Sequence, residues 1–106
     1  MEIINCTPHT IVVDLDGNQV SFPASGILPR IETTSTPRNP IEGIPTFSVK
    51  RGEIEDLPAP EEGKVFLVSA MVFAATTRLD VIAPDTGPTA IRENGRILAV
   101  RNLLVP

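Results

Sequence analysis

One stretch of the chain, from Lys64 to Pro84, carries a long run of apolar residues that the other segments can cover. Its first part, Val65 to Val68, is apolar at every position, which is typical of a strand buried on both faces. Ser69 is suited to cap a short helical turn over Ala70 to Ala75. A second strand is expected at Val81 to Ala83. The pattern therefore predicts a strand, a turn of helix and a strand at the centre of the core.

Shorter segments with alternating or β-branched apolar residues predict strands before and after this unit. They are Glu2 to Cys6, Thr10 to Leu15, Asn18 to Phe22, Ile27 to Thr34, Ile44 to Lys50 and two strands within Ile91 to Arg101. Asp16-Gly17 and Asn94-Gly95 predict hairpin turns, because a type I′ turn needs positive φ at both central residues. Pro29 cannot occupy a central ladder position, so its strand is expected at an edge.

Two segments are predicted to lack regular structure. Ser35 to Gly43 has two prolines and no periodicity, so we expect a mobile surface loop there. Asp56 to Gly63 is rich in proline and acidic, which favours an irregular crossing back to the core. Between them, Phe47 and Val49 alternate with polar residues, as in a strand with one solvated face. A turn is expected at Arg51-Gly52.

Seven or eight short strands with frequent turns indicate an all-β, mainly β fold. We expect a small barrel or sandwich with at most one short helix. The chain of 106 residues is expected to form one β domain over residues 1–106. Two cores of half that size would each bury too little apolar surface to be stable.

Composition and charge narrow the classes of partner. The hydrophobic fraction is 42% and no apolar run is long enough to span a membrane, so no membrane partner is expected. A net charge of −4 disfavours duplex nucleic acid. The first residues contain no secretion leader, which favours the cytoplasm. Arg makes up seven of the nine basic residues, which suggests contacts with anions, although a solvated ion-pair surface explains the bias equally well.

The single cysteine and the single histidine limit the possible chemistry. Cys6 has no partner for an internal disulfide, and its strand-like setting favours a buried structural thiol. His9 follows the kink expected at Pro8 and is more often structural than functional in such a setting. No cluster with metal-ligand spacing accompanies it, so neither a metal nor a cofactor is expected. Nucleophilic catalysis would require Ser69 or Cys6 to meet His9 and a carboxylate.

Two pairs of polar residues could form a binding site. Arg78 and Asp80 flank Leu79, so both would point to one side of an extended segment. They form either a salt bridge at the start of the Val81 strand or a grip on an anionic ligand. Thr7 and His9 have the same spacing. If the segments are neighbours, the ligand site contains Thr7, His9, Ser69, Arg78 and Asp80, and further anion-binding candidates are Arg30, Arg92 and Arg96.

Motifs spread over nearly the whole chain resemble those of a family of small bacteriophage and prophage proteins. They are Asn5-Cys6-Thr7-Pro8-His9, Ser25-Gly26, Gly43-Ile44-Pro45, Leu57-Pro58, Val68-Ser69, Arg78-Leu79-Asp80 and Pro84. The resemblance implies a phage setting and no particular chemistry. Leu is the residue expected in that family at the position of Cys6, which implies a buried apolar position.

Three functional hypotheses follow. The first is a non-enzymatic phage protein that captures a small anionic ligand, for example a nucleotide derivative, in the host cytoplasm. Its site would lie at a subunit interface of a homo-oligomer, because a barrel of this size has little internal room. The second is a module that inhibits a host enzyme or belongs to the virion and contacts its protein partner through Ile41, Ile44 and Leu57. The third is a small hydrolase or isomerase that uses His9.

Overall fold

The computed structural model describes residues 1–106, and a four-stranded mixed sheet forms its centre. The strands are β1 (Glu2–Asn5), β6 (Lys64–Leu67), β7 (Val81–Pro84) and β10 (Leu103–Leu104), in the order β1-β6-β7-β10. The first three run parallel, and β10 is antiparallel to β7. The predicted strand, helical turn and strand are confirmed as β6, α1 (Ala70–Ala74) and β7.

The core lies on both faces of β6 and β7. Phe66 and Val68 are buried with Cys6, Val72 and Val81 on one face of the sheet. Leu67 alternates with them and is also fully buried. Burial of both faces explains why this segment is apolar at every position.

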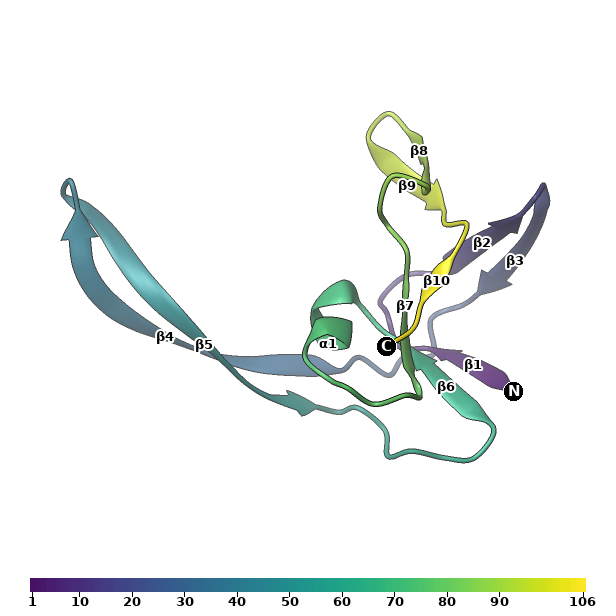
Figure 1. Ribbon diagram of the computed structural model, residues 1–106, viewed down its shortest axis with the longest axis horizontal. Coiled ribbons are helices and arrows are strands. Elements are labelled where there is room, and N and C mark those ends of the chain that lie inside the picture. The colour runs from purple at the N-terminus through teal and green to yellow at the C-terminus, as the bar shows by residue number, and fades with distance from the viewer.

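Three antiparallel hairpins extend from this body (Figure 1). They pair β2 (Ile11–Leu15) with β3 (Asn18–Phe22), β4 (Arg30–Ile41) with β5 (Ile44–Glu55), and β8 (Ile91–Glu93) with β9 (Arg96–Ala99). The predicted turns at Asp16-Gly17 and Asn94-Gly95 are confirmed, because all four residues have positive φ. The β2–β3 hairpin joins the body through backbone bonds from Asp14 N to Val100 O and from Val100 N to Val12 O.

The mainly β class is confirmed, but the expected barrel is not formed. The structure has ten strands rather than seven or eight, distributed over one mixed sheet and three separate hairpins. Each hairpin forms a ladder only within itself, apart from a single bridge between Val13 and Val100. The sheets therefore have free edges and do not close. α1 is the only helix, and at five residues it lacks the length and the apolar span needed to cross a bilayer.

The largest difference from prediction is the β4–β5 hairpin, which we call the arm (residues 30–55). The loop expected at Ser35 to Gly43 is instead strand up to Ile41, and no turn forms at Arg51-Gly52, because β5 continues to Glu55. Proline is tolerated because each strand of a two-stranded ribbon has a free edge, where a missing N–H costs no ladder bond. The arm reverses at Glu42-Gly43, where both φ angles are positive.

The buried sheet should dominate stability. Leu67→Ala is expected to lower the free energy of unfolding by about 2–5 kcal/mol, because it opens a cavity in a closely packed core. Leu79→Ala is the matched control, because Leu79 is 84% exposed, and its cost should stay within about 0.5 kcal/mol. Urea denaturation of both variants measures the difference. Equal costs would contradict the placement of the core.

Candidate functional site

The side chain of Asn5 organises the segment that leads to His9. Asn5 is 2% exposed, and its Nδ2 donates to the backbone oxygens of His9 (2.8 Å) and Phe22 (2.7 Å). Its Oδ1 accepts from the backbone N of Thr7 (2.9 Å) and from Thr7 Oγ1 (2.6 Å). The backbone oxygen of Asn5 accepts from Ser25 Oγ (2.7 Å). One buried amide therefore fixes the kink after β1 and joins it to the end of β3.

This network separates the roles of Thr7 and His9. Thr7 is buried, and its hydroxyl lies within hydrogen-bond distance of Asn5 Oδ1 and of the His9 carbonyl (3.0 Å). Its polar atoms are occupied inside the fold. The backbone of His9 is held by the same network, whereas its side chain is exposed. Of the two residues, only His9 presents a polar side chain to solvent.

Ser69 acts as the cap of α1. It precedes the helix with extended backbone angles, and its side-chain oxygen accepts a bond from the Val72 backbone N (3.4 Å). This confirms the predicted cap over the short helical turn. The hydroxyl satisfies a backbone N–H that would otherwise lack a partner at the start of the helix.

Arg78 and Asp80 form a two-pronged ion pair with each other. Arg78 Nε lies 2.9 Å from Asp80 Oδ1, and Arg78 Nη2 lies 2.6 Å from Asp80 Oδ2. The Arg78 guanidinium also lies 6.0 Å from the centroid of the Phe66 ring, within the range of a cation–π contact. The hydrogen bond from Arg78 lowers the pKa of Asp80 and raises that of Arg78. The pair matches the predicted salt bridge at the start of the Val81 strand.

The five residues of the predicted polar site do not converge on one surface. Thr7 and His9 follow the carboxyl end of β1, and Ser69 follows that of β6. Arg78 and Asp80 instead precede β7, which is parallel to both strands. Residues before and after parallel strands lie at opposite ends of a sheet. The pair is therefore separated from His9 by the length of the sheet.

Two of the three further arginine candidates, Arg30 and Arg92, have other neighbours within the chain. Arg30 begins β4 at the base of the arm and is opposite Glu55 in the ladder. Arg92 in β8 donates to the backbone oxygens of Gly87 (3.0 Å) and Thr86. Both bonds brace the loop between β7 and β8, so the Arg92 guanidinium already has acceptors within the chain.

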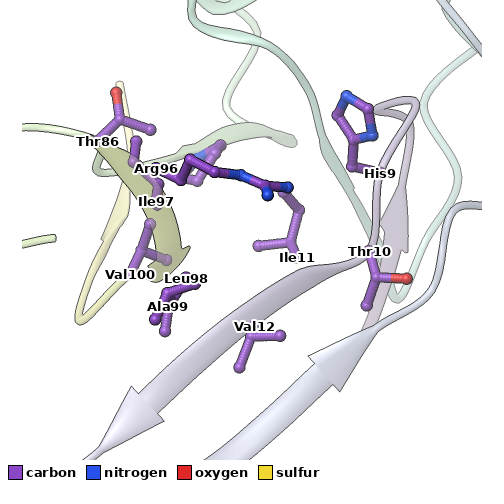
Figure 2. A pocket seen from close by; sticks show the side chains of 11 residues that line it. His9, Thr10, Ile11, Val12, Thr86, Arg96, Ile97, Leu98, Ala99 and Val100 are labelled. Carbon is purple, nitrogen blue, oxygen red and sulfur yellow. The ribbon is translucent and has the colours of Figure 1, made fainter. Parts of the chain in front are cut away.

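His9 lines a cavity of about 440 Å³ between β2 and β9 (Figure 2). The wall is mainly apolar and includes Ile11, Val12, Ile97, Leu98 and Val100. The cavity lies at the carboxyl end of the parallel sheet. Among its lining residues, His9 follows β1, Pro84 is the last residue of β7, and Thr86 comes after β7.

Arg96 supplies the other ionisable side chain of this cavity. Figure 2 shows it extending from β9 toward Ile11 on β2. Arg96 takes part in none of the side-chain hydrogen bonds or ion pairs of the chain, although Glu93 is its neighbour in the β8–β9 ladder. No Asp or Glu lines the cavity. The site therefore combines one uncompensated guanidinium, one imidazole and an apolar wall.

Four further residues bear on the other sequence hypotheses. Cys6 is buried, as predicted, and burial raises the pKa of its thiol against a smaller opposing effect of the hydrogen bond with Ser25. Ile41 and Ile44 are exposed at the tip of the arm, as a protein-binding surface requires. Leu57 is instead partly buried against the core cluster. No three His, Cys, Asp or Glu side chains gather as a possible metal site.

Sequence reasoning did not give Asn5 and Arg96 the importance that the structure gives them. Asn5 belongs to the motif Asn5-Cys6-Thr7-Pro8-His9, but its structural role depends on backbone acceptors four and seventeen residues away. Arg96 was one of several arginines with no distinguishing neighbour. Its place at the cavity depends on the contact between β9 and β2, which no local pattern encodes.

Comparison of the chain with known protein families, curated proteins and solved structures finds no match.

Asn5→Ala should destabilise the fold strongly. It removes the partner of the buried Thr7 N–H and of the partly buried Phe22 carbonyl and one of two donors near the His9 carbonyl, and each unsatisfied group costs about 1–3 kcal/mol. We expect the free energy of unfolding to fall by at least about 2 kcal/mol. Asn18→Ala is the control, since the exposed Asn18 side chain makes no hydrogen bond. Equal urea midpoints for the two variants would show that the network does not hold the kink.

The Arg78–Asp80 pair predicts a pH-dependent contribution to stability. The folded pKa of Asp80 is lowered, so the pair contributes fully above the unfolded value of about 3.9. The contribution is lost as the pH falls through the lower folded pKa. Asp80→Asn should therefore cost about 1 kcal/mol at pH 7, a modest amount because solvent screens the pair. The difference from the wild type should shrink below about pH 4.

Leu79→Ala is the control, because Leu79 lies between the paired residues and its replacement removes no charge. In urea unfolding at several pH values, the free energy of unfolding of this variant should differ from that of the wild type by a constant amount. A cost of Asp80→Asn that stayed the same down to the lowest pH would show that the ion pair adds nothing to stability.

Proposed function

We propose that this chain is a non-enzymatic binding protein of a phage setting that captures a small anionic ligand in the cavity between β2 and β9. The ligand carries a phosphate or carboxylate that Arg96 and His9 bind, and an apolar or ring-shaped part that the wall covers. Nucleotide derivatives combine both features. Of the residues first considered for this role, His9 and Arg96 line the cavity.

The observation that carries this proposal is the uncompensated guanidinium of Arg96 beside an apolar wall. Arg96 has no acceptor within the chain, and the residues that line the cavity include no carboxylate. A guanidinium binds phosphate or carboxylate through two parallel hydrogen bonds. Arg96 and His9 are both exposed, so their attraction for an anion acts partly through solvent and is screened by salt.

Size and shape are consistent with a ligand of nucleotide dimensions. A volume of about 440 Å³ lies within the range of roughly 300–1,000 Å³ typical of small-molecule sites. Such sites usually combine apolar walls with a few placed polar groups, as this one does. His9 stands on a segment that the buried Asn5 network fixes, so its backbone needs little ordering on binding.

The same lining favours capture over turnover. Nucleophilic catalysis by His9 would need a nucleophile and an orienting carboxylate within hydrogen-bond reach. Ser69 caps α1, Asp80 is paired with Arg78, and the thiol of Cys6 is buried. The hydroxyls in the cavity wall belong to Thr10 and Thr86, and no acid accompanies them.

Arg96→Gln should weaken ligand binding by at least about tenfold, because hydrogen bonds to charged groups contribute about 1.5–3 kcal/mol. The assay is isothermal titration calorimetry with inorganic phosphate and with nucleoside mono- and diphosphates. Native mass spectrometry with the small-molecule fraction of phage-infected cells extends the range of ligands. Binding should also weaken as salt concentration rises.

Arg30→Gln is the matched control, because it removes the same charge at the base of the arm and should leave the affinity unchanged. Two results would refute the proposal. One is the absence of any bound small molecule in both assays. The other is a ligand whose affinity falls equally in the Arg96→Gln and Arg30→Gln variants.

A further inference from the structure

The arm makes the chain far more extended than a compact domain of its length. The Cα radius of gyration is 16.7 Å, against about 13 Å for a compact chain of this size. The structure measures 53 × 37 × 23 Å along its principal axes. Strands of twelve residues reach roughly 40 Å, and Figure 1 shows the arm projecting away from the body.

One face of the arm is more apolar than the other, and its large apolar side chains cover nothing. Pro37 is opposite Phe47 in the ladder and Ser35 is opposite Val49, while the polar pair Thr33 and Arg51 lies nearer the base on the same side. Phe47 is 59% exposed and Val49 is 61% exposed. The opposite face is polar and consists of Thr34, Thr36, Arg38, Thr46, Ser48 and Lys50. Alternation of this kind belongs to a strand pair with one buried and one solvated face, yet here the apolar face remains open.

A second hairpin has a similar open face. On β2 and β3, Val13 is opposite Val20 and Ile11 is opposite Phe22, so these side chains share one side. Leu15 also lies on that side and is 54% exposed, and Val20 is 41% exposed. Val13, Leu15, Val20 and Phe22 line a groove of about 340 Å³ together with Leu103, whereas Ile11 lines the cavity of His9 and Arg96.

Charge favours the approach of the outer arm to another copy but does not select the groove. Residues 33–51 carry a net charge of +2 and the remaining residues carry −6, although the whole arm is neutral because its base holds Glu32, Glu53 and Glu55 against Arg30. The outer arm is therefore attracted to the acidic body of another copy, whereas two outer arms repel each other. Asp14 lies on the hairpin face away from Val13 and Leu15, and Arg101 is the one charged residue that lines the groove. The contact itself therefore depends on burial of apolar surface.

The surface area is sufficient for a stable interface. The chain exposes 7463 Å², whereas a compact protein of 11.4 kDa exposes about 5,800 Å². The surplus is roughly 1,700 Å². A standard interface buries about 800 Å² on each partner, so an interface with a second copy would cover about half of this surplus.

We infer that the chain forms a reciprocal dimer in which the apolar face of each arm packs on the β2–β3 groove of the other copy. The two hairpins meet face to face, as in a sandwich whose two sheets come from different chains. The arm and the β2–β3 hairpin lie at opposite ends of the long dimension in Figure 1. Two copies placed side by side and antiparallel can therefore make both contacts around one twofold axis, which closes the assembly.

The first test compares two neighbouring positions on β5. Light scattering on an eluting size-exclusion peak should give the wild type twice the chain mass of 11.4 kDa. Phe47→Asp should give the mass of one chain, because it places a charge in the buried interface. Ser48→Asp introduces the same charge on the polar face and should leave the dimer intact. A wild type that is monomeric at about 100 μM, a concentration at which even weak specific interfaces form, would refute the inference.

The second test identifies the surface that receives the arm. Leu15→Asp should also give a monomer, since it places a charge in the groove. Mixing Leu15→Asp with Phe47→Asp should restore a heterodimer, because the arm of the first variant and the groove of the second are both intact. Failure to form a heterodimer would refute the arm-to-groove contact, as would a dimer in the Leu15→Asp variant alone. Circular dichroism of each variant confirms that it is folded.

Host-protein binding by the arm is the competing outcome. It would appear as a monomeric wild type whose arm binds another protein. Ligand affinity is measured separately through Arg96→Gln, so loss of the dimer and loss of ligand binding are distinguishable results.

Discussion

The buried side-chain amide of Asn5 is the contact on which the arrangement of the body depends. Its two N–H groups bond to the backbone at the start of β2 and the end of β3, and its oxygen accepts both bonds from Thr7. Every hydrogen-bonding position of the amide is used inside the protein, where an unsatisfied group would be costly. The parallel sheet and the β2–β3 hairpin are thereby joined, and His9 is placed at the edge of the cavity.

The small core sets a second constraint. Only 14 of 106 residues are buried, and most of them lie on or beside β6 and β7. The arm contributes Ile31 and Ile54, both near its base, to the surroundings of this core. Beyond them, the arm is a two-stranded ribbon, and a hairpin of that kind is marginally stable in water by itself. Burial of Phe47 and Val49 against another copy would supply the packing that the chain does not provide.

Local chemistry predicted much of the fold. The Asp16-Gly17 and Asn94-Gly95 turns were identified because each needs positive φ, and Ser69 because a helix start needs an acceptor. The arm was not predicted, since the prolines between Ser35 and Gly43 were interpreted as marks of a loop. That rule assumes a strand paired on both edges, whereas each strand of the arm has one neighbour.

The candidate site was predictable only in part, for a related reason. The Arg78–Asp80 pair is local, and of its two predicted roles, a salt bridge or a grip on an anionic ligand, the structure forms the salt bridge. His9 was a candidate because it follows the kink at Pro8. Its place in one cavity with Arg96 depends on a bridge between Val13 and Val100, which are far apart in the sequence. Spacing within one segment cannot show which distant strand will lie beside it.

Availability separates Arg96 from the two arginines that already hold acceptors. A new anion at Arg78 would have to displace Asp80, and one at Arg92 would have to displace two backbone oxygens. Each displacement would cost as much as the existing bond contributes, so the net gain would be small. Arg96 has no such bond to lose. Arg30, Arg51 and Arg101 have none either, and Arg96 differs from them because it lines the cavity of His9 and its apolar wall. The same reasoning applies to Phe47 and Val49, whose exposed apolar surface has no contact within the chain to give up when a partner covers it.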